Sequence, residues 1–598
     1  LNPHKTRVLL GSANNRTLAV TAYSSALDLH PDDDTLGSII LHPGEPSTYG
    51  AAIMGIPIGT DQYTDIWLQQ KLEALTEEAH RIQEFPDGQI QWTMAQQSLR
   101  HRVNHIYRGL PLSTVHAFKG QANELLLDIF ACTCGYSKEE ILAYCASEDR
   151  AAPLLYQLEA PVSLAGFDLL FSDIRADAAY VGAICSVHKE VIKHFSLNNG
   201  TLRFPAPESQ EDVLDAVHRL GVVLSMPSLS LLEIMNGAVT DVPDGKFQRR
   251  LAAAAHLAAY EQFKMRVNKD IRMHLEQLEG PYSGSFLRAR CKGITRLAHI
   301  VFEIAMTRRA GLPLKMVSRY VTCCCKKKEV LDRHGTHLIR CSAKNTWQKR
   351  HDSVVTTMVM LARMAGLPTV MNPIGDFNII YDASALPASP PRTTITRDVS
   401  DSAADSDSAT VSDITISSQE DSEAMLTNGT LARRRRGLQA DIAIDNVGIL
   451  KHIKTTLRSQ RIVCDICVTD DGLVGKEKEK VKKYSAAAKR NNLLFIPLVF
   501  NTYGNWTSKV DDFIKGLSNH YTKKSCPTPE DLSTRLASYP VNRWRTMVSC
   551  AVHRAVGWQL LSRYNFLVNA GIPNSVSTSE HYQQRVSLTS SLDARCAN

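Results

Sequence analysis

Cysteine and histidine side chains gather in one short segment that could bind a soft metal ion. Six of them occur within 19 residues, at Cys323, Cys324, Cys325, His334, His337 and Cys341. Zinc takes four such ligands in a tetrahedron, and a short turn closed by two ligand pairs supplies them. The spacing predicts a zinc site formed by Cys323 with Cys325 and by His337 with Cys341. Cys324 and His334 are alternative ligands, and reduced cysteines beside an ordinary surface histidine are the competing interpretation.

A second group of residues has the types needed to hydrolyse a phosphodiester bond. Asp441 begins one apolar, strand-like run, and Asp465 interrupts the next. A carboxylate inside such a run is costly to bury unless it is paired or bound to a metal. Lys480 and Lys483 follow, one helical turn apart on a shared face.

Phosphodiester cleavage at neutral pH needs a divalent metal that activates water and neutralises charge, and it needs a cation near the nucleophile. We therefore expect Asp441 and Asp465 to bind Mg²⁺, or Mn²⁺ in its place. Lys480 or Lys483 is expected to orient the attacking water, and the sequence does not decide between them. An exposed aspartate at a strand end and a solvated lysine-rich helix face are the competing interpretations.

The elements around these residues divide the chain into a mainly helical part and a smaller α/β part. Short strands and turns are expected from 1 to about 70, and apolar residues at helical spacing follow up to about 310. The predicted helices are 66–83, 91–108, 114–134, 138–147, 176–195, 210–222, 247–279, 288–309 and 347–365. Strand-like runs at 439–444, 461–468 and 493–500, with a helix at about 475–490, predict an α/β domain. A helical tail is expected at 527–575.

Composition limits the class of protein. A chain of 598 residues, 44% hydrophobic and 22% charged, is expected to form three or four domains. No apolar run reaches the roughly 18 residues of a membrane span, and no secretory signal is visible, so we expect no membrane partner and reduced thiols. Basic residues cluster at 325–350, 433–436 and 476–490, whereas acidic residues gather between 398 and 423. The basic clusters suit a polyanionic partner, although single runs of this kind often only solvate helices.

Taken in order, the segments resemble the C-terminal part of non-LTR (LINE-type) retrotransposon polyproteins. The C-terminal matches are CCC, DRHGTHLIRC, KRHD, QADIAI, DICVTD, KVKKY and FIPLVFNTYG. They are similar to a zinc knuckle, an Arg-His motif and the strands and lysine motif of a restriction-like PD-(D/E)xK endonuclease. The N-terminal matches are LNPHKT, IMGIPIG, RVNHIYRGLP and APVSLAGFDLLFSD, which resemble the end of a reverse-transcriptase palm, its primer grip and its thumb. The likeness covers about 1–185 and 320–505.

The resemblance implies a role for each matching residue. The implied zinc ligands are Cys323, Cys325, His337 and Cys341. The implied Mg²⁺ ligands are Asp441 and Asp465, with Lys480 or Lys483 as the catalytic lysine. The implied nucleic-acid contacts are Arg350, His351, Lys5 and Tyr484, of which Arg350 and His351 could instead order the site.

The resemblance also implies a multidomain α+β fold, with a mostly helical thumb and linker region before a small zinc knuckle and an α/β restriction-endonuclease-like domain. The expected domains are the palm end with the primer grip at 1–70, a thumb-like region at 71–185, a helical linker at 186–320, the knuckle at 321–345, the endonuclease at 346–385 and 431–520, a disordered acidic insert at 386–430 and a helical tail at 521–598. The implied activity is a nick in target DNA that primes reverse transcription of element RNA in the nucleus. Target DNA and element RNA are the expected partners.

Departures from the family pattern qualify this expectation. Gln439 replaces the proline of a Pro-Ala-Asp strand, and Asn372 replaces an acid for which Asp376 or Asp382 could substitute. Cys467 occupies the simplest lysine position, so the lysine must come from the next helix. A catalytically inactive, nucleic-acid-binding remnant is therefore the alternative, and a cellular zinc-binding scaffold is a third. The chain begins in mid-motif, downstream of the polymerase Asp pair, so we expect a fragment that cannot polymerise alone.

Overall fold

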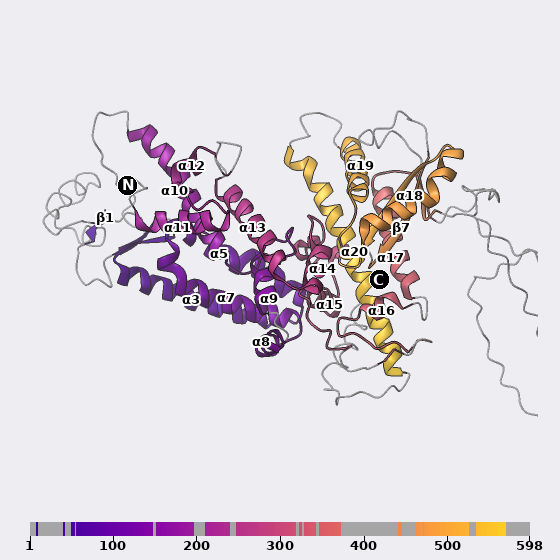
Figure 1. The fold of residues 1–598 in the computed structure, drawn as a ribbon, viewed down its shortest axis with the longest axis horizontal. Coiled ribbons are helices and arrows are strands. Elements are labelled where there is room, and N and C mark those ends of the chain that lie inside the picture. The colour runs from indigo at the N-terminus through magenta and orange to yellow at the C-terminus, as the bar shows by residue number, and fades with distance from the viewer. Residues whose placement is uncertain are drawn as a thin grey trace, which may run out of the picture.

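The computed structural model describes residues 8–9, 40–41, 50–53, 55–147, 151–195, 210–237, 239, 247–317, 322–323, 325, 328–341, 346–371, 440–444, 461–470, 472–525 and 534–569. In these residues the protein is mostly helical with small sheets, which agrees with an α+β chain of several domains. Figure 1 shows two lobes, with α14 (Lys269–Leu278) and α15 (His299–Arg309) between them. Lys5 and the predicted insert at 386–430 lie outside the described residues.

Two short strand pairs precede the helices of the N-terminal lobe. β1 (Val8–Leu9) pairs in parallel with β2 (Ile40–Leu41), and β3 (Gly50–Ile53) pairs with β4 (Ile56–Gly59) in an antiparallel hairpin. The helices of this lobe are α3 (Asp61–Gln83), α4 (Gly88–Met94), the π-helix η2 (Ala95–Leu99), α5 (Arg100–Asn104), α6 (Ile106–Gly109), α7 (Leu112–Thr133), α8 (Lys138–Ser147), α9 (Ala151–Glu159), α10 (Asp173–Phe195), α11 (Glu211–Val223), α12 (Leu231–Met235) and α13 (Phe247–Arg266).

Helical periodicity locates most of these helices, but it misses where they end. The predictions at 114–134, 138–147, 176–195 and 210–222 are confirmed to within a few residues. The single helix predicted at 247–279 is wrong, because Asn268 adopts an extended conformation and caps α14 by accepting the Ile271 N–H. The helix predicted at 288–309 is wrong in its first half, where the short 3-10 turns η5 (Ser285–Arg288) and η6 (Gly293–Thr295) precede α15.

The C-terminal lobe is built on a four-stranded sheet in the order β5-β6-β7-β8. Its strands are β5 (Thr369–Met371), β6 (Ile442–Ile444), β7 (Ile462–Thr469) and β8 (Leu494–Asn501). The first three strands are antiparallel, whereas β7 and β8 are parallel. Parallel neighbours need a crossover, which α18 (Leu473–Arg490) supplies. The three predicted strand runs and the lysine-rich helix are confirmed, and the short strand β5 was not predicted.

Four further helices complete this lobe: α16 (Thr336–Arg340), α17 (Thr346–Met364), α19 (Ser508–Ser525) and α20 (Thr534–Asn569). The long helix α20 crosses the lobe beside α17 and α19 (Figure 1). The largest hydrophobic cluster extends from Trp67 to Leu567 and includes the knuckle cysteines Cys323 and Cys341, whereas the buried residues shared by α10, α11, α12 and α13 form a separate cluster. The helical lobe, the knuckle and the sheet therefore share a core. None of the described helices is long and apolar enough to span a bilayer.

Candidate metal centres

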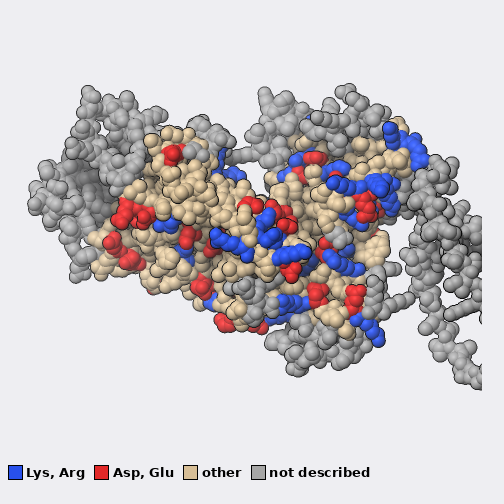
Figure 2. Space-filling model, in the orientation of Figure 1, with Lys and Arg blue, Asp and Glu red and all other residues tan. Residues whose placement is uncertain are grey.

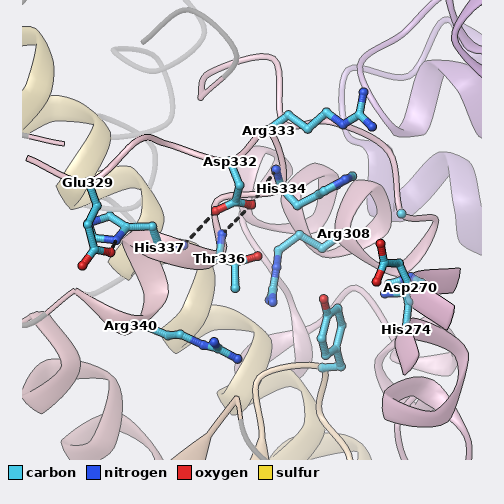
Figure 3. A pocket seen from close by; sticks show the side chains of 12 residues that line it. Asp270, His274, Arg308, Glu329, Asp332, Arg333, His334, Thr336, His337 and Arg340 are labelled. Atoms are coloured by element: carbon cyan, nitrogen blue, oxygen red, sulfur yellow. Dashed lines mark hydrogen bonds and ion pairs between the residues drawn. The ribbon is translucent and has the colours of Figure 1, made fainter. Parts of the chain in front are cut away.

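A tight turn and a short helix position the four predicted zinc ligands. The Cys323 N–H donates to the carbonyl of Glu329 at 2.8 Å, and the Lys328 N–H donates to the carbonyl of Cys325 at 2.9 Å. The Asp332 carboxylate then caps helix α16, accepting the backbone N–H groups of His334, Thr336 and His337 at 2.9 to 3.0 Å (Figure 3). This cap fixes the helix that carries His337 and ends at Cys341.

The ligand atoms of Cys323, Cys325, His337 and Cys341 all lie within 4.8 Å of one another. The sulfurs of Cys323 and Cys341 are 3.9 Å apart, and the sulfur of Cys325 is 3.6 Å from His337 Nε2. Zinc–sulfur bonds of about 2.3 Å imply a sulfur–sulfur separation of about 3.8 Å across a tetrahedron. The four residues could therefore hold a zinc ion.

The structure also bears on the alternative ligands. The His334 ring lies with Nδ1 3.3 Å from the carbonyl of Leu312 and is not part of the ligand cluster. Cys324 lies outside the described residues. The other ring nitrogen of His337, Nδ1, lies 2.6 Å from Glu329 Oε2. A carboxylate at this position fixes the tautomer that leaves Nε2 to face the cysteines, as is usual for a metal-binding histidine.

The two predicted acids lie across from each other on neighbouring strands. Asp441 directly precedes β6, and the antiparallel register that pairs Ile442 with Cys464 sets Asp441 level with Asp465 in β7. Residues that face each other across an antiparallel pair point to the same side of the sheet. Asp441 Oδ2 accepts the Ile466 N–H at 2.6 Å, so its carboxylate reaches the backbone beside Asp465.

One of the two predicted lysines contacts Asp465. Lys480 Nζ lies 2.6 Å from Asp465 Oδ2, a buried carboxylate oxygen. Burial raises the pKa of Asp465; the Lys480 ammonium opposes the rise, and the charge of Asp441 adds to it. Lys483 is exposed, with Nζ 4.9 Å from the centre of the Tyr484 ring. The geometry therefore singles out Lys480.

Tyr484 is corrected from a nucleic-acid contact to a core residue. Its side chain is 4% exposed and stacks on Phe495, with the ring centres 4.9 Å apart. It also forms a hydrogen bond with Asp465, which lowers the pKa of that carboxyl. A tyrosine buried in this way cannot stack on a base, but it can hold Asp465 in position.

Arg350 is likewise corrected, from a phosphate contact to an internal link. Its guanidinium donates to the carbonyls of Ile339 and Val468 and to the side chain of Gln559, at 2.9 to 3.2 Å. Burial lowers the pKa of Arg350 to about 10. It ties the knuckle helix, strand β7 and helix α20 together.

His351 lies at the acids rather than on an open surface. Its Nε2 is 3.2 Å from Asp441 Oδ2, and its Nδ1 is 3.0 Å from Asp352 Oδ1. Burial lowers the pKa of His351, but the bonds to Asp441 and Asp352 outweigh this effect and raise it to about 9. The imidazolium therefore orients the Asp441 carboxylate.

A cavity of about 740 Å³ opens beside the knuckle (Figure 3). Its charged and polar lining residues are Asp270, His274, Arg308, Glu329, Asp332, Arg333, His334, Thr336, His337, Arg340 and Tyr503. Arg333 and Arg340 are exposed and reach the cavity from different sides. Arg308 is buried, lies over the Tyr503 ring and donates to the carbonyl of Thr502 at 3.0 Å. Exposed arginines therefore lie next to the candidate zinc ligands, together with the acids Asp270, Glu329 and Asp332, and Arg340 is paired with Asp470 at 2.9 Å.

Basic side chains also gather over α18. Figure 2 shows Lys and Arg crowded over this helix, and a second group between the two lobes near α14. The basic residues of α18 are Lys476, Lys478, Lys480, Lys482, Lys483, Lys489 and Arg490. The helix that brings Lys480 to Asp465 therefore also carries a positively charged outer face.

Two residues at the candidate zinc centre were not predicted from the sequence. Glu329 could have been found, because it lies between the ligand pairs and a metal-binding histidine usually needs a carboxylate partner. Arg563 lies 222 residues beyond Cys341, and its guanidinium reaches the cysteine sulfurs only because α20 packs on the knuckle. No local signal in the sequence points to it.

No family model matches the chain, and no curated protein matches it either. The resemblance to retrotransposon polyproteins therefore stays a prediction, and a function is inferred from the geometry of the two centres.

Proposed function

We propose that the chain is part of a non-LTR retrotransposon polyprotein and acts as a metal-dependent endonuclease that nicks target DNA. The new 3′-hydroxyl primes reverse transcription of the element's RNA, which places the activity in the nucleus. The observation that carries this proposal is the meeting of Asp441 and Asp465 on adjacent strands, with Lys480 from the crossover helix 2.6 Å from Asp465. Two acids and an amine in this arrangement are what metal-assisted phosphodiester hydrolysis requires.

The two carboxylates fit a hard divalent cation. Mg²⁺ is commonly bound by one or two carboxylates, with water completing its octahedron. Asp465 is 4% exposed, and the charge of Asp441 adds to the effect of its burial, so a second cation beside Lys480 would offset the cost of keeping this buried carboxylate ionised. When bound, Mg²⁺ activates water and neutralises charge on the phosphate.

The remaining chemistry belongs to side chains that are in place. Lys480 orients the attacking water and stabilises the negative charge that develops next to Asp465. His351 holds Asp441 in the orientation that faces Asp465, and Tyr484 supports Asp465 from the core. The basic outer face of α18 and the arginines at the knuckle cavity bind the DNA and RNA backbones.

A catalytically inactive nucleic-acid-binding remnant is the second candidate, and one observation favours it. Each acid already has a cationic partner, His351 for Asp441 and Lys480 for Asp465. Structural ion pairs of this kind also occur in proteins that bind no metal. The two candidates predict different Mg²⁺ affinities: an active endonuclease should bind the ion at Asp441 and Asp465, whereas an inactive remnant should not.

Nicking of supercoiled plasmid DNA tests the proposed activity. The zinc-loaded full chain should relax the plasmid in Mg²⁺ and not after chelation of Mg²⁺. Asp465→Ala should abolish nicking while DNA binding persists, whereas Asp512→Ala, which removes an exposed acid from α19, should nick normally. Unchanged nicking by Asp465→Ala would falsify the metal assignment.

A further inference from the structure

Helix α20 reaches the zinc centre from a distant part of the chain. Gln559 and Arg563 are four residues apart, so they lie on the same face of this helix. The Gln559 side-chain amide donates to the carbonyls of Ile339 at 2.9 Å and Leu338 at 3.4 Å. These carbonyls lie at the end of α16, where a helix leaves its acceptors without internal partners. The face of α20 that carries Arg563 is thereby held against the knuckle.

Arg563 contacts two of the four zinc ligands directly. Its NH2 group lies 3.0 Å from the sulfur of Cys341 and 3.3 Å from the sulfur of Cys323. Arg563 is 1% exposed, and the two cysteines are 6% and 1% exposed. The contact is therefore enclosed by protein, and water screens it little.

The contact between Arg563 and the two cysteines would compensate the negative charge of the zinc-bound site. A Zn²⁺ ion bound by three thiolates and one neutral imidazole forms a complex with a net charge of −1. Burying that charge is costly unless a cation and hydrogen-bond donors compensate it. Glu329, about half exposed, adds a further negative group on His337. Arg563 supplies the compensating charge, and its N–H groups point at the sulfurs that carry most of the negative charge.

We propose that Arg563 is a positioning residue of the zinc centre: a buried guanidinium from α20 that neutralises the thiolate-rich site and sets its zinc affinity. The centre is then complete only when α20 is docked. This inference rests on the zinc centre and not on the nuclease activity. An arginine needed only for packing would affect folding stability, but it would leave zinc affinity and the electronic properties of the thiolates unchanged.

The test compares zinc affinity in three full-length variants by competition with a chromophoric chelator at fixed pH. Arg563→Met should bind zinc about 10- to 100-fold more weakly than the wild type, as loss of an outer-sphere partner usually causes. Arg563→Lys should lose less zinc affinity, because the lysine keeps the positive charge but lacks the planar guanidinium whose N–H groups reach both sulfurs. Arg554→Met is the matched control: this arginine on the same helix donates to the carbonyls of Ile294 and Arg296 instead.

Cobalt(II) substitution keeps the test decisive if Arg563→Met fails to fold. In Arg563→Lys the thiolate-to-cobalt charge-transfer band should shift relative to the wild type, because the N–H donors to sulfur have changed, whereas Arg554→Met should leave the band in place. Wild-type zinc affinity in Arg563→Met, or an unshifted band and unchanged affinity in Arg563→Lys, would overturn the role of Arg563. A wild-type chain that binds no zinc would overturn the zinc centre as well, whereas nicking measured in Mg²⁺ bears only on the proposed nuclease.

Discussion

Lys480 and Lys483 differ in what they contact, although the sequence presents them as equivalent. Both follow the second acid on one helical face, and residue type alone could not rank them. Packing of α18 against β8 directs Lys480 to Asp465, whereas Lys483 stays exposed beside the Tyr484 ring. The distinction depends on how the helix is rotated against the sheet, which no local pattern in the sequence encodes.

This difference predicts unequal effects of two matched substitutions. Lys480→Met should reduce the rate of Mg²⁺-dependent nicking by about 100-fold or more, because in the proposed mechanism it removes the cation beside the attacking water. Lys483→Met removes the same charge from the neighbouring turn and should stay within about threefold of the wild type at saturating DNA. Single-turnover nicking of plasmid measures both. Equal losses would show that the lysines act only through the charge of the helix.

The four candidate zinc ligands were predictable for the opposite reason. Cys323, Cys325, His337 and Cys341 lie close in sequence, so their spacing already limits their separation in space. Arg350 and Tyr484 were misassigned because burial depends on tertiary contacts from far along the chain, such as that between Arg350 and Gln559. Residue type shows that a side chain can bind phosphate or stack on a base, and it does not show whether solvent reaches that side chain.

At the scale of elements, periodicity identified the long helices and the buried strands. It failed where a break depends on a single cap, as at Asn268, or where a strand is short and half-exposed, as at Thr369–Met371.

The sequence also could not predict which helices pack against each other. Helix α19 is joined to α20 through Asp511, which is 2% exposed and accepts two hydrogen bonds from Arg545 at 2.8 and 2.9 Å.

Asp511→Asn should weaken this junction. Burial alone would raise the pKa of Asp511, but the bonds from Arg545 and Lys515 outweigh burial and lower it. Such a carboxylate stabilises the fold above its unfolded pKa of about 4, and this stabilisation is lost as the pH falls through the lower folded value. Urea unfolding should show a loss of about 3 kcal/mol at pH 7 and a smaller difference below about pH 4. A difference that does not depend on pH would contradict the ion-pair explanation.

At the scale of the whole molecule, the knuckle and the sheet contribute buried side chains to the same hydrophobic cluster. This cluster runs from the N-terminal helices through the knuckle to α20. Composition could show that the chain is long enough for several cores, but it could not show that distant segments share one. The basic surface is distributed in the same way, over α18 and between the lobes (Figure 2).

Salt dependence of DNA binding tests the basic cavity beside the knuckle. If these arginines bind the nucleic-acid backbone as proposed, Arg333→Ala and Arg340→Ala should each remove one phosphate contact and reduce the slope of log K against log salt concentration by about one. Arg81→Ala, an exposed arginine on α3 in the other lobe, should leave the slope unchanged. Zinc content should be equal in all three variants. An unaltered slope in both cavity variants would place the nucleic acid elsewhere.

Mg²⁺ binding to the zinc-loaded chain, measured by calorimetry, bears most directly on the two acids. We expect the wild type to bind Mg²⁺ or Mn²⁺ at a site that is lost in Asp441→Asn and in Asp465→Asn and kept in Asp512→Asn. Loss in both of the first two variants would mean that one ion needs both carboxylates. A wild type that binds neither ion, or an Asp465→Asn variant that binds as tightly as the wild type, would contradict a shared metal site and leave the nucleic-acid-binding remnant as the better description.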